Sequence, residues 1–580
     1  GKAGIRIGGK QRIMLANLGF QPCGQGCFGN PATNLLTSFS KCHYLTPIQL
    51  ASDGLNFCLQ PLVREKIVAA ASRTEIILVG SEKLVPVLGQ RGILPPEPED
   101  ALVQAVGDPA DKLPESLKRK SAPALPEMSQ IHVLRHYMRI SQETLGVDLN
   151  IDIGQGTCTM KYSPKVNDQL ARSPKMSELH PLQPVSSVQG ILEVMYKFEQ
   201  ILKEIWGMDR VTLQPGAGSS AIYANISMIR AYHTARGESE QRNEVITTIF
   251  SHPSNAAAAK VAGYKIITLY PDAEGYPDLE ALKAAVSKHT AALMITNPED
   301  TGVFNPRIEE FVRIVHAAGG LCSYDQANAN GLLGITRARD AGFDVCHFNL
   351  HKTFSTPHGC GGPAAGACGV TKEMSPFLPT PTVEFDGASY YLDFNRPQSI
   401  GKIRPWYGVA PNILKAYAWV MSLGADGLRE ISEIAVLNNN YLLSKVLEIR
   451  GVSMPYTKGK RRIEQVRYSW EQLTNETGVH SEEIGFRAAD FGTHYWTSHH
   501  PFVVPEPMTL EPTESYSKED LDEYVAILKH IAEEAYTKPE IIHTAPHNSV
   551  VHKIDQESFD DPEAWAVTWR AYQRKVLKNK

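Results

Sequence analysis

The residue most suited to covalent chemistry is a lysine at the end of an apolar run. The run ends at Leu350, Lys352 and Thr353 follow, and the string FNLHKTFSTPHGCGGPAAGACG fills residues 348–369. A lysine amine in a buried cleft is poorly solvated, which favours the neutral form that attacks a carbonyl carbon. Lys352 is therefore a candidate for Schiff-base formation, although an isolated lysine would more often be a surface residue before a turn. We expect the Gly-, Pro- and His-rich segment after it to form no regular structure.

Three further candidates each follow a β-branched, apolar run. Asp325 ends SYD, where it could cap the next helix or hold a protonated pyridine nitrogen. His252, in SHPSNAAAA, could stack on a flat ring or serve as a hydrogen-bonded turn histidine. The string LQPGAGSSAIYANI (213–226) reads as a strand, a tight turn and a helix. Backbone amides at that helix N-terminus would form a phosphate cup, although any tight turn of this kind looks alike. The cup would consist of Gly216, Ala217, Gly218, Ser219 and Ser220.

These residues need a scaffold in which strands end side by side. Apolar, β-branched runs alternate with helical patterns between residues 181 and 377. This alternation predicts a mostly parallel sheet with helices on both faces, and ligands bind beyond the carboxyl ends of such strands. The expected strands are 211–215, 245–250, 265–270, 291–297, 321–325 and 345–350, and the expected helices are 219–235, 255–263, 278–289 and 307–319. Long helical patterns at 428–449 and 518–536 predict an α+β C-terminal domain.

Length and composition limit the classes of protein that fit. A chain of 580 residues needs several domains, and its net charge of −5 does not favour nucleic-acid or membrane partners. No apolar run reaches the roughly 18–20 residues of a membrane helix. Nine dispersed cysteines favour reduced thiols and a cytoplasmic protein, and Cys23 with Cys27 lacks the partners of a metal site, so no metal is expected.

The chain also divides by composition. A helical run at 62–71 and an apolar run at 75–80 precede a proline-rich linker at 93–127. The predicted divisions are an N-terminal extension of unknown role (1–110), an arm (111–180), a large cofactor-binding domain (181–424), a small C-terminal domain (425–555) and a basic tail (556–580).

A phosphate cup, a stacking ring, an acid and a lysine, in that order, are typical of pyridoxal-phosphate (PLP) enzymes. The fold expected is the aspartate-aminotransferase-like, type I PLP-dependent transferase fold. SELHPLQP (177–184), TNP (296–298), NLHKTFSTPHG (349–359) and LEPTE (510–514) resemble glycine decarboxylase, the P-protein of the glycine cleavage system. The similarity covers roughly 110–555 and is greatest to the lysine-bearing second subunit of the split enzyme, as in a divergent homologue.

The resemblance implies a role for each candidate. Lys352 would form the Schiff base, Asp325 would pair with the pyridine nitrogen, and His252 would stack on the ring. The cup and His351 would lie at the phosphate. The other implied cofactor-binding residues are Asn297, Ala327 and Thr353, and the substrate-lining candidates are His180, Cys158, Lys161, Ser254, Asn255 and Gln326.

Several motifs depart from the family pattern. NAGAQGE has become GAGSSAI, which replaces an acid by Ile222, and GANLNA has become QANANG, which puts Gln326 beside Asp325. Where the family has HGTNPAS and TNPNT, this sequence has HPSNAAA and TNPED. In addition, Cys360 interrupts a run of glycines. The cofactor anchors are kept while the lining residues change, which is consistent with an altered substrate, partner or reaction.

The implied reaction is decarboxylation of an amino acid through an external aldimine and a carbanion. In the glycine cleavage system the aminomethyl product passes to a lipoyl carrier protein. Two alternatives remain open: a different PLP reaction, such as decarboxylative condensation in specialised metabolism, and a non-catalytic partner subunit. The family's functional unit has two homologous halves, so we expect a homodimer or a homologous partner subunit.

Overall fold

The computed structural model describes residues 104–105, 107, 113–121, 129–142, 145, 149–154, 161–358, 362–456, 458–493 and 503–549. The chain divides into two units, Gly1–Met138 and Arg139–Lys580, and each is described by itself. The predicted helix at 62–71, the run at 75–80, the tail at 556–580 and most of the linker lie outside the described residues. In the first unit the described elements are a 3-10 helix, Glu115–Leu117, and the start of the exposed helix α6 (Gln130–Gln142).

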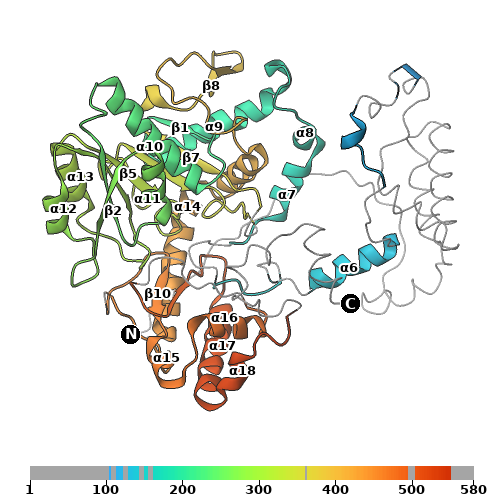
Figure 1. Ribbon diagram of the computed structural model, residues 1–580, viewed down its shortest axis with the longest axis vertical. Helices are drawn as coiled ribbons and strands as arrows, with labels where there is room; N and C mark the ends of the chain where they lie inside the picture. The colour runs from blue at the N-terminus through green and yellow to red at the C-terminus, as the bar shows by residue number, and fades with distance from the viewer. Residues whose placement is uncertain are drawn as a thin grey trace, which may run out of the picture. The chain divides into compact units, whose positions relative to one another are not determined.

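A seven-stranded sheet organises the second unit (Figure 1). Its strand order is β1-β7-β6-β5-β4-β2-β3, and the five strands β6, β5, β4, β2 and β3 pair in parallel with one another. The strand β7 runs antiparallel to both of its neighbours, β6 and β1. The α/β prediction of a mostly parallel sheet is therefore confirmed, and all six expected strands form. The strands are β1 (Arg210–Thr212), β2 (Glu244–Thr248), β3 (Lys265–Leu269), β4 (Thr290–Thr296), β5 (Leu321–Gln326), β6 (Val345–Asn349) and β7 (Gly366–Val370).

The seventh strand corrects the expectation that residues after Lys352 form no regular structure. GACGV at 366–370 is a fully buried strand. A Cβ at Gly369 would lie 2.9 Å from the Trp206 ring and 3.0 Å from Cys346 Sγ, so only a glycine fits there. The strand is built from small residues because the space beside it is already filled, and small residues are a poor signal for a strand.

Helices cover both faces of the sheet because the strand residues alternate between two apolar cores. In β4, Leu293 and Ile295 enter one core, while Ala292 and Met294 enter the other. The first core is covered by α9 (Gln189–Trp206), α12 (Leu279–Ala285), α13 (Ile308–Ala317) and the first part of α14 (Ala410–Val446). The second core is covered by α10 (Gly218–Ala235) and α11 (Pro253–Val261).

A long helix joins the sheet to the C-terminal elements. Figure 1 shows α14 descending from the sheet towards them, and Gly424, at φ 66°, interrupts its helical backbone. The predicted helix 428–449 is the second part of α14. A third apolar core packs it against an antiparallel strand pair and four helices. These are β10 (Val466–Ser469), α15 (Glu471–Thr477), α16 (Ser481–Ala489), β11 (Pro507–Leu510), α17 (Lys518–Thr537) and α18 (Pro539–His543).

The remaining elements are short. They are α7 (Lys165–Arg172), α8 (Pro174–Ser177), the 3-10 helices Val185–Ser187 and Ser375–Phe377, and the hairpin of β8 (Thr382–Phe385) and β9 (Tyr390–Asp393). Within the described part of the chain, no helix has both the length and the apolar character needed to cross a bilayer.

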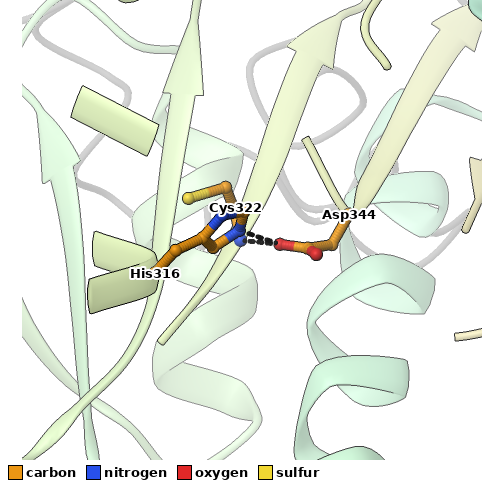
Figure 2. Close-up of side chains that lie close together, drawn as sticks. All are labelled: His316, Cys322 and Asp344. Carbon is orange, nitrogen blue, oxygen red and sulfur yellow. Dashed lines mark hydrogen bonds and ion pairs between the residues drawn. The ribbon is translucent and has the colours of Figure 1, made fainter. Parts of the chain in front are cut away.

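A carboxylate fixes the amino-terminal edge of the sheet, opposite the strand ends that carry the candidate residues. Asp344 Oδ2 accepts hydrogen bonds from the Cys322 backbone at 2.7 Å and from His316 Nε2 at 2.8 Å. Figure 2 shows both donors meeting the carboxylate while the Cys322 sulfur points away from it. The cluster therefore ties α13 to the starts of β5 and β6.

Candidate active site

A cavity of about 350 Å³ lies at the carboxyl edge of the parallel strands. Its walls come from the turn before α10, from the ends of β5 and β6, and from the residues that follow β2 and β6. The structure thus brings together side chains that are more than 130 residues apart in the sequence. The predicted site residues that line this cavity are Ala217, Gly218, Ser219, His252, Ser254, Asp325, Ala327, His351 and Lys352.

Lys352 lies in the turn after β6 and is 8% exposed. The turn is closed by its backbone N–H, which donates to Asn349 O at 3.0 Å. Among the described residues, none forms an ion pair with its ammonium group. A buried amine without a carboxylate partner is suited to react with an aldehyde.

Asp325 provides the buried negative charge of the cavity. Burial alone would raise its pKa, but the nearby His347, the Asn255 amide, His252 and the Ala327 N–H together hold the pKa below its usual value. Asn255 Nδ2 donates to Oδ2 at 2.7 Å, and Ala327 N donates to Oδ1 at 3.0 Å. Asp325 is therefore ionised and oriented, and can stabilise a proton on a nearby ring nitrogen.

His347 is a site residue that the sequence analysis missed. It pairs with Asp325 in the parallel register of β5 and β6, and its Nε2 lies 3.2 Å from Asp325 Oδ1. Burial lowers the pKa of His347, with a contribution from the Lys352 charge and against the opposing effect of Asp325. The signal was a histidine inside an otherwise apolar strand, since such a residue must face a polar group.

Two more histidines surround Lys352, and both are neutral. Burial lowers the pKa of His351 to about 3, and its Nδ1 lies 2.9 Å from Ala365 O. The His358 ring meets the His351 ring edge-on at 4.9 Å, and burial lowers its pKa too. His358 lines the cavity but was not predicted to do so. Polar rings without charge can orient a substrate without binding its carboxylate as an ion pair.

His252 has one of the two roles considered for it, that of a hydrogen-bonded turn histidine. It is the N-cap of α11, where its Nδ1 accepts from Ser254 N at 3.2 Å, and it also lines the cavity. The cap fixes the ring at the entrance of α11. Asn255, one turn further on, is 1% exposed and reaches the cavity through its bond to Asp325.

The predicted phosphate cup begins α10. The amides of Gly218, Ser219 and Ser220 belong to the first turn, whose N–H groups have no acceptor within the helix. Ser220 Oγ turns back and accepts from Ala217 N at 2.9 Å, so it shapes the turn and does not line the cavity. Gly216 lies outside the lining as well, because the Arg404 side chain covers it.

Other predicted residues serve the surrounding structure. Asn297 Oδ1 accepts from Asn305 N at 2.7 Å, and Thr353 Oγ1 accepts from Ala329 N at 2.9 Å. Gln326 is buried in β5 and, because strand residues alternate, faces away from the side of Asp325. None of these three lines the cavity.

The two described residues predicted in the arm, His180 and Lys161, do not line the cavity. His180 is exposed and contacts the Trp406 ring edge-on at 6.2 Å. Lys161 is 1% exposed, with its Nζ 2.8 Å from Glu514 Oε1. Cys158 lies outside the described residues.

The C-terminal elements hold the wall that carries Asp325. Glu511, just after β11, accepts hydrogen bonds from the carboxamides of Asn328 and Asn330. These two asparagines follow Ala327 in the loop after β5. Glu511 therefore fixes the loop beside the cavity, and a shift of the segment after β11 would move the cavity wall.

The donor set of the cavity fits PLP. It offers a buried amine, an ionised carboxylate and a helix N-terminus built from small residues. Gly218 also leaves a cradle that a side chain would fill, since a Cβ there would lie 2.7 Å from the Asn349 carboxamide.

Comparisons with known proteins agree with this geometry. The chain matches the family model "Glycine dehydrogenase, C-terminal domain" over residues 431–553 and "Aminotransferase class-V" over residues 224–385. It is 48% identical over 471 residues to the probable glycine dehydrogenase (decarboxylating) subunit 2 of Pyrococcus furiosus, covering 81% of this chain and 92% of that protein. The protein of that name from Halalkalibacterium halodurans is 44% identical over 444 residues, covering 77% of this chain and 90% of that protein.

A solved structure shows the same fold. Glycine decarboxylase (P-protein) of the glycine cleavage system, in an inhibitor-bound form, matches with a TM-score of 0.63 at 20% identity. The match covers 76% of this chain and 99% of that one. The fold and the family resemblance expected from the sequence are confirmed. The chain belongs to the family of glycine dehydrogenase (decarboxylating) subunit 2, whose members are PLP-dependent enzymes.

Proposed function

We propose that this chain is the lysine-bearing subunit of a PLP-dependent decarboxylase that acts on glycine. The observation that carries the proposal is the single cavity that unites Lys352, ionised Asp325 and the N-terminus of α10. The names of its relatives support glycine as the substrate.

Each residue has a distinct task in this proposal. Bound PLP supplies an electron sink for the pair of electrons left behind when CO₂ departs. Lys352 Nζ would hold the cofactor through its aldehyde carbon and, when free, could carry a proton. Asp325 would keep the ring nitrogen protonated, and His252 would stack on the ring.

The neutral histidines suit the loss of a carboxylate. Among the described residues that line the cavity, none is an arginine. His351 and His358 can orient a carboxylate by hydrogen bonds without an ion pair to anchor it as a charged group. A weakly held carboxylate in a pocket that excludes water is more easily expelled.

Assembly and acceptor belong to the same proposal. The relatives are named as a subunit 2, which supports a homologous partner subunit, with a homodimer as the alternative. A lipoyl carrier protein would take the aminomethyl product. The buried free thiols of Cys322, Cys346 and Cys368 are consistent with a reducing compartment such as the cytoplasm.

One observation favours a second candidate, a PLP enzyme for another amino acid or another reaction. Ile222 lines the cavity at the position where the family pattern has an acid. An apolar group there would favour a substrate with a hydrocarbon side chain over glycine.

Carboxyl-labelled amino acids test the two candidates. The PLP-loaded chain is assayed alone and with any homologous subunit that copurifies. We expect labelled CO₂ from glycine, a yellow protein, and loss of both in Lys352→Ala. The control is Lys402→Ala, because Lys402 is exposed. Release from a larger amino acid and not from glycine would favour the second candidate, and a protein that stays colourless with PLP would refute both.

A further inference from the structure

A guanidinium group lies against the turn before α10 and has no acidic partner. A Cβ added to Gly216 would overlap Arg404 Nη1. Arg404 Nε is buried without a hydrogen-bond acceptor, and the described residues offer no carboxylate to the rest of the group. Gly216 adjoins Ala217, which lines the cavity.

The backbone around Arg404 is fixed to the strand that leads into the turn. Ile403 N donates to Gln214 Oε1 at 2.6 Å, two residues before Gly216. Gly408, at φ +134°, leaves no room for a side chain beside Leu213 O. Arg404 is therefore held beside the turn by its neighbours and not by a salt bridge of its own.

This placement is unfavourable unless an anion is bound. The N-terminus of a helix carries a partial positive charge, and arginine side chains are stabilising at the opposite end. A cation and a helix N-terminus that share one spot repel each other. An anion between them would be attracted by both.

Asn349 supplies a second, independent observation at the same place. It lines the cavity, is 5% exposed, and its carboxamide packs on Gly218, the first residue of α10. Its Oδ1 is buried without a hydrogen-bond partner among the described residues. An amide oxygen only accepts and cannot bond to a phosphate dianion, but the Nδ2 of the same carboxamide donates to none of the described residues and is the atom that can donate to a ligand oxygen.

We propose that Arg404 and Asn349 complete a phosphate-monoester site at the N-terminus of α10, and that they bind the phosphate of PLP. The inference rests on the proposed function, since it needs PLP in this cavity. A phosphate dianion has enough acceptor oxygens for the first-turn amides, the guanidinium fork and one carboxamide together.

Affinity for PLP, compared with pyridoxal, tests the role of Arg404. Pyridoxal lacks the phosphate but keeps the aldehyde and the ring nitrogen. We expect Arg404→Met to weaken PLP binding to the apoprotein by about 10- to 100-fold, the usual range for losing a charged hydrogen bond. Pyridoxal binding should stay within about twofold, which also shows that the variant is folded. Lys402→Met is the control, because it removes an exposed positive charge two residues away and should change neither affinity.

Two further measurements complete the test. Inorganic phosphate should compete with PLP in the wild type, and about tenfold more should be needed in Arg404→Met. Asn349→Ala should weaken PLP more than pyridoxal. If the binding of PLP and pyridoxal weakened equally, or did not weaken, this inference would be overturned while the proposed function would still stand. A wild-type protein that binds neither ligand would overturn the proposed function, and the inference with it.

Discussion

Two fully buried acids, one in the cavity and one in a loop outside its lining, take opposite protonation states because their neighbours differ. Asp325 accepts two hydrogen bonds from amides, and its pKa stays below the usual value despite burial. Glu299, in the loop after β4, accepts from the Thr248 hydroxyl, and burial raises its pKa to about 8. Asp325 is therefore the anion available to a cofactor, while Glu299 is neutral over most of the physiological range.

This difference predicts how stability depends on pH at a single residue. The pKa of Glu299 in the folded chain lies above its value in the unfolded chain, so the wild type loses stability as pH rises between the two values. Glu299→Gln keeps the neutral shape and removes this loss. We expect the free energy of unfolding of the variant, relative to that of the wild type, to increase by up to about 1.4 kcal/mol per pH unit between about pH 5 and pH 8.

Thermal unfolding of both proteins across that pH range measures the effect. Glu309→Gln is the control, because Glu309 is exposed on α13 and its replacement should give no trend with pH. If the difference in stability between Glu299→Gln and the wild type stayed constant with pH, this would contradict a neutral, buried Glu299.

Sequence reasoning found residues at strand ends and missed those that other segments bring to the site. Asp325 and Lys352 could be predicted because the first lies in the last residues of a recognisable strand and the second lies just after one. His347 lies inside a strand, and only the register of β5 and β6 shows that it faces Asp325. Arg404 comes from an irregular loop far along the chain, and no local pattern relates it to Gly216.

At the scale of elements, the loop between β4 and α13 docks on the segment that leads into β10. Ile463 N donates to Gly302 O at 2.8 Å, and Asp300 forms a buried ion pair with Arg467. Gly302 has φ +78°, and a Cβ there would overlap Gln465 O. The contact is therefore made backbone to backbone, which only glycine permits.

Gly302→Ala should separate these two elements. Backbone strain costs about 1–2 kcal/mol, and the clash with Gln465 adds to it. The matched control is Gly478→Ala, which has nearly the same φ, +77°, and nothing within 4 Å of the added Cβ. We expect Gly302→Ala to lower the unfolding temperature clearly more than the control does. Equal decreases in the unfolding temperature of the two variants would mean that the loop does not dock closely on the segment that leads into β10.

The amino-terminal edge of the sheet predicts a second trend with pH. The hydrogen bond to Asp344 raises the pKa of His316. The contribution of this pair to the stability of the fold is therefore complete below the pKa of a histidine in the unfolded chain. It is lost as pH rises through the higher pKa of His316 in the folded chain. His316→Gln should destabilise the chain most below about pH 6, by roughly 0.2–1 kcal/mol because the ring is partly exposed, and less near pH 9. Thermal unfolding with and without Asp344→Asn checks this, since the pH trend should vanish in that background.

Elements were predictable where one pattern dominates the local sequence. The strands rich in β-branched residues were found, and α10 and α13 follow their apolar period. The strand β7 was missed because its small residues fit a space shaped by Trp206 and Cys346, which lie elsewhere in the chain. The helix α12 ends at Ala285, short of the expected residue 289, because Val286 is already extended.

At the scale of the molecule, an apolar surface beside the turn before α10 suggests where a second chain binds. Leu182 is 70% exposed and Trp406 is 39% exposed. The two segments are joined by the Tyr407 hydroxyl, which donates to Pro181 O at 2.7 Å. Arg404 belongs to the same segment as Trp406, so a chain that covers this surface would also lie close to Arg404.

We predict that this surface contacts a second chain of the same fold, either another copy or the homologous subunit. The native mass of the purified protein should be at least twice that of one chain. Leu182→Asp places a charge on the surface and should shift the mass towards that of a single chain, while the PLP-bound protein stays yellow because Lys352 and Asp325 are untouched. Leu437→Asp is the matched control, since Leu437 is 69% exposed on α14. A single chain that releases CO₂ from glycine unaided would contradict the prediction. Equal dissociation of the two variants would also contradict it, because the interface would then not lie at the surface of Leu182 and Trp406.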